Sequence, residues 1–118
     1  MIRVLLIAIT LILHSPTIVI AKPSPALLDR TEKDVLDCLA YTSSVNCTKA
    51  SGSIENIKAS SGPQGNDCNF QATKLMLLLM IFEDNEGIGA GSNGGANKYR
   101  AESLKQLNNM KKSCSMKK

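Results

Sequence analysis

Four cysteines are the side chains of this 118-residue chain with the clearest covalent chemistry. Their spacings of 9, 21 and 46 residues contain no C-x₂-C pair, which argues against a zinc site and against a thiol–disulfide oxidoreductase. An even number of cysteines in a short chain is typical of a disulfide framework formed in an oxidising compartment. We therefore expect two disulfides among Cys38, Cys47, Cys68 and Cys114, and three pairings are possible.

Two further patterns are compatible with ligand chemistry but lack the context that it needs. Gly89 to Gly94 matches G-x-G-x-x-G, but a dinucleotide site requires a preceding strand, and a leucine-rich helical segment precedes it here. The carboxylates Glu83, Asp84 and Glu86 lack the alternating ligands and fixed glycine of a calcium loop, so a solvated helix end explains them better. The sequence therefore predicts no catalytic residue, no metal site and no cofactor.

The amino-terminal segment has the layout of a secretory signal peptide. Arg3 precedes an apolar run from Val4 to Leu13, and Val19-Ile20-Ala21 forms a small-residue cleavage site before Lys22. We expect residues 1–21 to be removed and residues 22–118 to form one secreted, extracellular domain. The leader contains His14, the only histidine, so the mature chain would lack the usual base of hydrolytic enzymes.

The charge balance is mildly basic. The chain has 14 Lys and Arg and 10 Asp and Glu, so removal of Arg3 leaves a net charge of +3. This dilute charge and the scarcity of aromatic residues argue against nucleic-acid binding. No segment of the mature chain is long and apolar enough for stable membrane insertion. The basic tail indicates either weak retention on sulfated glycans or a solvated helix end, through Lys111, Lys112, Lys117 and Lys118.

Apolar periodicity predicts a helix over residues 24–40. Ser24 and Pro25 suit the helix start, and Leu28, Val35 and Leu39 share one stripe, with Leu27 and Leu36 at its margins. Residues 42–50 are small and polar and are expected to form a connection. The stretch from Ser53 to Lys58, with Ile54 and Ile57, is compatible with a short helix or a strand, and residues 60–66 form a turn region.

Two more helices are predicted in the carboxy-terminal half. Residues 68–82, capped by Asn66 or Asp67, are apolar on every side near their end, which indicates a central helix packed by neighbours on several faces. Residues 87–97 are rich in glycine and are expected to be a mobile loop. Residues 98–114 place Leu104, Leu107 and Met110 on one face, with Lys105, Asn108, Asn109 and Lys112 outward.

Asn46 begins the sequon Asn46-Cys47-Thr48 within the expected connection. Glycosylation of Asn46 is a hypothesis that depends on whether the transferase acts before Cys47 is held in a disulfide.

These elements predict an all-α fold, a small disulfide-stapled helical bundle. A domain of this size buries only about two-thirds of the surface of its unfolded chain, so its stability is expected to depend on covalent links. Each disulfide is expected to contribute roughly 3 kcal/mol to stability.

The order of these features resembles the interleukin-4/interleukin-13 group of short-chain four-helix cytokines. The resemblance is carried by Val45-Asn46-Cys47-Thr48, by Ile54 to Ser60, by Cys68 with Ala72-Thr73-Lys74-Leu75, and by Ala101 to Leu107 with Cys114. The family pattern requires three helices after Cys47, whereas two are evident, and the missing one would lie between Phe82 and Lys98. Either the bundle is abbreviated, or the segment from Ile54 to Ser60 is a helix and the topology differs.

The resemblance implies an extracellular signal that bridges two cell-surface receptor chains without a cofactor or catalysis. It implies one receptor-binding face on the first helix, at Arg30, Glu32 and Lys33, and a second on the last helix, at Lys105, Asn108 and Lys112. Disulfides Cys38–Cys114 and Cys47–Cys68 would suit such a closed bundle.

Two other functions compete with this one. A secreted carrier of small apolar ligands would line its cavity with Met76, Leu79, Met80 and Phe82. A basic membrane-active peptide is disfavoured because the positive charge is dilute.

Overall fold

The computed structural model describes residues 22–41, 43–62, 66–87 and 95–116. The described residues form four α-helices and no strand: α2 (Pro25–Tyr41), α3 (Ser44–Ser60), α4 (Asp67–Gly87) and α5 (Gly95–Ser115). The fold is therefore the expected all-α bundle. Residues 1–21 and the G-x-G-x-x-G segment lie outside the described residues, as do Lys117 and Lys118.

Helix α2 confirms the helix expected over residues 24–40. The Leu27 N–H donates to the Ser24 Oγ at 3.1 Å, which caps the helix, and Pro25 occupies the first helical position. Leu28, Val35 and Leu39 are buried as expected. Of the two marginal leucines, Leu27 packs partly against the core, whereas Leu36 is 41% exposed.

Helix α3 occupies residues 44–50 of the connection that was expected over residues 42–50, which is wrong there. Ser43 caps it, with its Oγ accepting a hydrogen bond from the Asn46 N–H at 3.1 Å. The buried side chains Cys47, Ala50, Ile54 and Ile57 recur at intervals of three and four residues, which is the spacing of one helix face. Gly62, with φ of 96°, follows the helix end and lies within the turn region predicted over residues 60–66, of which residues 63–65 are outside the described ranges.

Helices α4 and α5 are both longer than predicted and shorten the glycine-rich segment between them. Asn66 starts α4, with its Oδ1 accepting a hydrogen bond from the Cys68 N–H at 2.8 Å. Helix α4 continues past Phe82 to Gly87, and α5 begins at Gly95 rather than at Lys98. The expected loop over residues 87–97 is therefore wrong at both ends, and residues 88–94 lie outside the described ranges.

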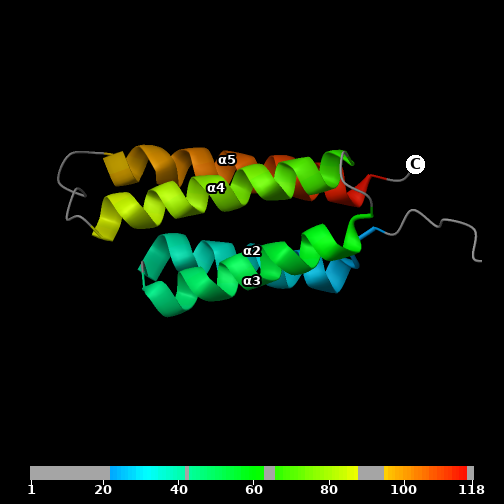
Figure 1. Ribbon diagram of the computed structural model, residues 1–118, viewed down its shortest axis with the longest axis horizontal. Helices are drawn as coiled ribbons and strands as arrows, with labels where there is room; N and C mark the ends of the chain where they lie inside the picture. Colours follow the sequence, from blue (N-terminus) through cyan, green and yellow to red (C-terminus); the bar gives the residue numbers. More distant parts are fainter. Residues whose placement is uncertain (1–21, 42, 63–65, 88–94, 117–118) are drawn as a thin grey trace, which may run out of the picture.

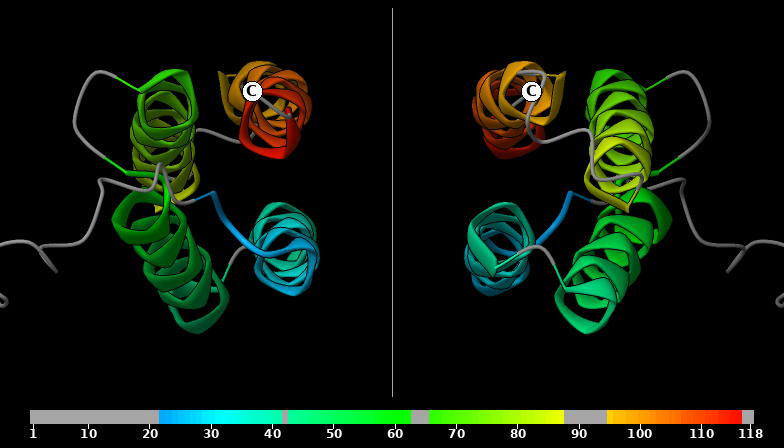
Figure 2. Two further views of the ribbon diagram at one scale, coloured as in Figure 1. Left: turned by 90° about the vertical axis from the view of Figure 1, so that its right-hand side faces the viewer. Right: turned by 90° about the vertical axis from the view of Figure 1, so that its left-hand side faces the viewer.

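Each helix runs antiparallel to the one before it, so the chain has an up-down-up-down order (Figure 1). Seen end-on, the four helices stand at the corners of a square, with α2 diagonal to α4 (Figure 2). Neighbours are α2 and α3, α3 and α4, α4 and α5, and α2 and α5, the last pair being the most loosely packed. Helix α4 is thus a corner helix rather than the central helix that the sequence predicted.

The position of the fourth helix corrects another expectation. It lies before Cys68, as α3, and not between Phe82 and Lys98. Of the two alternatives left open, the segment from Ile54 to Ser60 is helical and the topology differs from the expected one. Bundles of the helical cytokine type run up-up-down-down with two long crossovers, whereas the links here are short.

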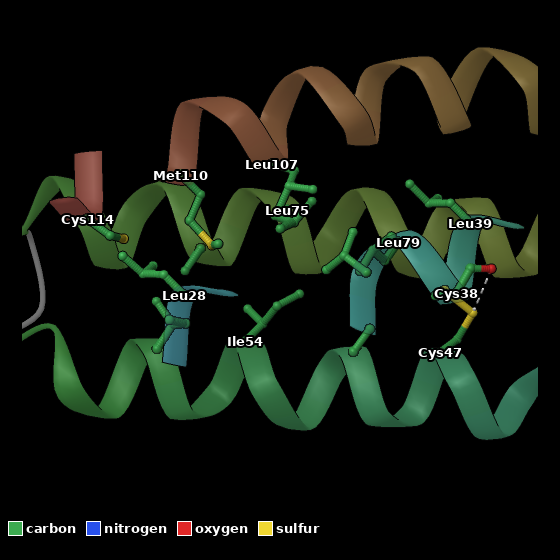
Figure 3. Packing of buried hydrophobic residues seen from close by; sticks show 14 of the residues in the cluster. Leu28, Cys38, Leu39, Cys47, Ile54, Leu75, Leu79, Leu107, Met110 and Cys114 are labelled. Atoms are coloured by element: carbon green, nitrogen blue, oxygen red, sulfur yellow. Dashed lines mark hydrogen bonds between the residues drawn. A yellow bond between two sulfur atoms is a disulfide. The ribbon is translucent and has the colours of Figure 1, made fainter. Parts of the chain in front are cut away.

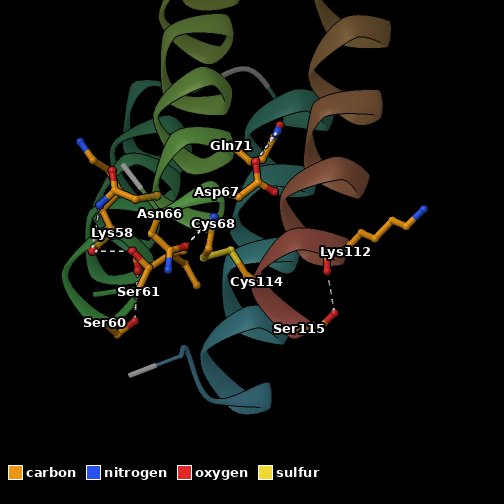
Figure 4. The surroundings of a disulfide bond; sticks show 12 residues. Lys58, Ser60, Ser61, Asn66, Asp67, Cys68, Gln71, Lys112, Cys114 and Ser115 are labelled. Atoms are coloured by element: carbon orange, nitrogen blue, oxygen red, sulfur yellow. Dashed lines mark hydrogen bonds between the residues drawn. A yellow bond between two sulfur atoms is a disulfide. The ribbon is translucent and has the colours of Figure 1, made fainter. Parts of the chain in front are cut away.

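Each disulfide joins the two helices of one antiparallel hairpin: one links α2 to α3 and the other links α4 to α5. Cys38 bonds to Cys47 and Cys68 bonds to Cys114. The pairing Cys38–Cys114 with Cys47–Cys68 is therefore wrong. The physical reason is proximity: Cys38 in the last turn of α2 lies beside Cys47 in the first turn of α3, and Cys114 near the end of α5 lies beside Cys68 at the start of α4 (Figure 4).

Side chains from all four helices fill the core. Figure 3 shows Leu28 and Leu39 of α2 and Ile54 of α3 facing Leu75 and Leu79 of α4, with Leu107 and Met110 of α5 closing the cluster. All of these are at most 8% exposed. The bundle has a filled centre built mainly from leucine, isoleucine and the cysteines.

Polar contacts complete the interfaces between neighbouring helices. The Ser53 Oγ donates to Asp34 at 2.5 Å between α3 and α2, and the Gln106 Nε2 donates to the Gln71 backbone oxygen at 2.9 Å between α5 and α4. The Arg100 Nε donates to the Leu39 carbonyl oxygen at 3.1 Å, and its guanidinium lies 5.3 Å from the centre of the Phe82 ring. Arg100 therefore ties α5 to both α2 and α4.

Candidate binding surface on α2 and α5

The six residues proposed for receptor contact lie on two neighbouring helices. Arg30, Glu32 and Lys33 belong to α2, and Lys105, Asn108 and Lys112 belong to α5. All are exposed except Glu32, which is half-buried. Glu32 contacts Lys111 of α5, whereas Arg30, two residues away and about 200° around α2 from Glu32, faces away from α5. Helices α2 and α5 are adjacent and together form one side of the bundle (Figure 2). We call this side the α2–α5 surface.

An ion pair joins the two helices within this surface. The Lys111 Nζ contacts the Glu32 carboxylate, and the two side chains are 37% and 32% exposed. Partly exposed pairs of this kind contribute at most about 1 kcal/mol, so the pair orients the surface more than it stabilises the fold. It also neutralises one of the four lysines proposed for sulfated glycans.

A hollow of about 370 Å³ lies between the start of α2 and the end of α5. Its apolar wall comes from Pro23, Pro25 and Leu28, and its other lining residues are Lys22, Asp29, Lys111, Lys112 and Ser115. This volume is within the range of about 300–1,000 Å³ that is common for ligand pockets. The hollow therefore combines an apolar wall with a charged rim.

Two exposed leucines extend the surface along the helices. Leu36 is one helical turn after Glu32, and Leu104 is two turns before Lys111, so each shares a face with one member of the ion pair. They are 41% and 38% exposed. Leu104 was expected in the buried face with Leu107 and Met110, which are buried. The difference follows from the loose packing of α2 against α5.

Sequence reasoning missed two parts of this surface. The hollow depends on residues 22–25 lying against the last turns of α5, which periodicity does not reveal. Arg100 was not singled out because its contacts, the Leu39 carbonyl and the Phe82 ring, are distant in sequence. The one sequence signal for Arg100 was its position near the buried side of an amphipathic helix, where an arginine needs a partner.

The residues proposed to line a carrier cavity do not share one face. Leu79 and Phe82 are buried in the core, and Met76 packs partly against it. Met80 is 53% exposed. These four side chains therefore do not all face the interior of the bundle.

Asn46 lies in the first turn of α3, so its expected position in a loop is wrong. Its side chain is half-buried, and its neighbour Cys47 is bonded to Cys38. The backbone around the sequon is held by the Ser43 cap. Glycosylation of Asn46 stays a prediction.

Within the described ranges, no group of three or more His, Cys, Asp or Glu side chains is arranged to hold a metal ion. All four cysteines are in disulfides. In the same part of the chain, none of the helices has the length and apolar character needed to span a membrane. The features with recognition chemistry on this side are thus the hollow, the ion pair, the two leucines and the exposed polar residues.

Comparisons with family models, with curated proteins and with solved structures give no match for this chain.

Proposed function

We propose that the protein is a secreted signalling protein that acts without catalysis, by binding a cell-surface receptor chain through the α2–α5 surface. Two disulfides in a small domain favour an oxidising, extracellular location. The predicted leader supports the same location. A small bundle held by two disulfides also suits recognition, because little ordering is needed on binding.

The observation that carries the proposal is the composition of the α2–α5 surface. Protein interfaces concentrate their binding energy in a few apolar or arginine contacts that seat in pockets, surrounded by polar residues that exclude water. The hollow with its wall of Pro23, Pro25 and Leu28 provides such a pocket. Leu36 and Leu104 provide apolar contacts beside it, and the exposed residues Lys33, Asn108 and Lys112 provide a polar rim.

The proposal concerns receptor binding and does not require the chain order of the interleukin-4/13 group. That group is expected to bridge two receptor chains through separate faces, whereas the hollow and the ion pair here lie together between α2 and α5. We therefore propose one receptor chain per copy of the protein on this surface.

The test uses the product secreted when the full chain is expressed in eukaryotic cells. The labelled product should bind saturably to cells of the source organism, and the double variant L36D/L104D should bind at least about tenfold more weakly. Val45→Asp is the matched control, since Val45 is 65% exposed on α3 and lies outside this surface. Circular dichroism shows that each variant is folded. Absence of saturable binding, or equal loss in the control, would contradict the proposal.

The hollow also favours a second function, transport of a small apolar ligand with an acidic group. Such a ligand would place its apolar part against Leu28 and its acidic group near Lys112. A fluorescent fatty acid should then bind at micromolar concentration and be displaced by unlabelled fatty acid. Lys112→Glu should weaken this binding, and no binding by the wild-type protein would remove the carrier function.

A further inference from the structure

The outer face of α4 is apolar although no other helix covers it. Phe70 is 60% exposed, Leu77 54%, Met80 53% and Ile81 39%. Helix α4 packs against α3 on one side and α5 on the other, and its remaining side faces outward at a corner of the bundle (Figure 2). The outward side of a bundle helix is ordinarily polar, so these side chains indicate a contact beyond the single bundle.

Helix α4 carries two seams with the spacing of a coiled coil. The inner seam, which packs in the core, consists of buried side chains at intervals of four and three residues: Cys68, Ala72, Leu75, Leu79 and Phe82. The outer seam repeats these intervals two residues later: Phe70, Lys74, Leu77, Ile81 and Asp84. A shift of two residues is about 200° around a helix, so the outer seam lies opposite the core. It has the pattern by which one helix packs against another.

The charges of the outer seam favour a second copy of this chain as the occupant. Consider an antiparallel pair of α4 helices related by a two-fold axis at the level of Leu79. A residue before position 79 in one copy then meets the residue that lies equally far after position 79 in the other copy. Leu77 then faces Ile81 of the second copy, and Lys74 faces Asp84 of the second copy. A parallel pair would instead place Lys74 against Lys74 and Asp84 against Asp84, which is repulsive. Lys74 and Asp84 are both exposed, so they are available for this contact.

We propose that the protein forms a symmetric dimer in which the two α4 helices pack antiparallel through this outer seam. The four exposed apolar side chains present on the order of 400 Å² per copy, so roughly 800 Å² is the upper limit of the apolar surface that the dimer can bury. Phe70 lies at the end of the seam, opposite position 88, which is outside the described residues. Stable interfaces bury about 1,200–2,000 Å², and the dimer is therefore weak and reversible. Helix α2 is diagonal to α4, so the dimer leaves it uncovered (Figure 2).

The test measures mass by sedimentation equilibrium on the secreted product, from about 1 µM to about 1 mM and at low salt. The wild-type mass should rise from that of a monomer to that of a dimer. Lys74→Asp alone and Asp84→Lys alone should each weaken the dimer by at least about tenfold, because each places like charges together at two symmetric positions. The double variant K74D/D84K should restore the dissociation constant to within about threefold, because it exchanges the two charges.

Lys49→Asp is the control, since Lys49 is exposed on α3 and should leave the dimer unchanged. All of the substituted side chains are exposed, so the fold should be preserved, and circular dichroism checks this. A monomer up to about 1 mM would overturn the proposal. So would single variants that weaken association without rescue by the double variant, because that result requires another register or another partner. The readout does not involve receptor binding, so it is independent of the proposed function.

Discussion

The two disulfides should contribute unequally to stability, although they bury the same kind of atoms. Cys38–Cys47 closes a loop of 9 residues and Cys68–Cys114 closes one of 46. In the chain-entropy relation, stabilisation grows with the logarithm of loop length and gives about 2.6 kcal/mol for the short loop and about 4 kcal/mol for the long one. The longer link should therefore contribute about 1.4 kcal/mol more.

The two links can be compared fairly because their surroundings are matched. All four cysteines are at most 5% exposed, so replacement of either pair by alanine removes two buried sulfur atoms from the core. The loops do not overlap in sequence, so their effects should be nearly additive. The difference between the variants C38A/C47A and C68A/C114A then reports chiefly on loop length.

Urea unfolding followed by far-UV circular dichroism measures this difference. The free energy of unfolding should fall in the order wild type, C38A/C47A, C68A/C114A. With a urea dependence of about 1–1.5 kcal/mol/M, the two variants should differ by about 1 M in midpoint. If C68A/C114A is unfolded without urea while C38A/C47A is folded, the order still holds. Equal loss in both variants, or greater loss in C38A/C47A, would refute the loop-length reasoning.

Three other substitutions test individual contacts by the same unfolding assay. Gly52→Ala should stabilise the protein by about 0.5–1 kcal/mol, since Gly52 is exposed within α3 and an added Cβ meets no atom within 4 Å; a lower midpoint would contradict this. Ser103→Ala should be neutral or stabilise the protein by up to about 1 kcal/mol, because the buried Ser103 Oγ has no hydrogen-bond partner among the described residues. A clear loss of stability would reveal such a partner. Arg100→Ala should lower the free energy of unfolding by about 1–2 kcal/mol, because the Leu39 carbonyl and the Phe82 ring both lose their contact with the guanidinium. An unchanged midpoint would show that these contacts contribute nothing.

The helices that the sequence predicted well are those with long apolar stripes and clear starts. Helix α2 has a serine cap, proline in the first position and the stripe Leu28, Val35 and Leu39. Helix α3 was missed because its buried face begins with Cys47 and Ala50, which a count of large apolar residues passes over. Ser43 as a cap, followed by this spacing, was the available signal.

The disulfide pairing and the composite α2–α5 surface depend on which helices are neighbours, and the apolar periodicity of separate segments does not reveal this without α3. Once α3 is a helix, short links favour two antiparallel hairpins, and each hairpin brings one pair of cysteines together. The same arrangement places α5 beside α2, which brings Glu32 into contact with Lys111. The apolar outer face of α4 was visible in the sequence, but it was assigned to packing within one bundle.

The central claim, receptor recognition by the α2–α5 surface, is tested most directly by site-specific photocrosslinking on intact cells. A photoreactive residue at Asn108, which is exposed on α5, should crosslink to a membrane protein of defined mass, and excess unlabelled protein should abolish the product. The same group at Val45 on α3 should give no such product. Equal crosslinking from both positions, or no competed product from Asn108, would contradict the claim.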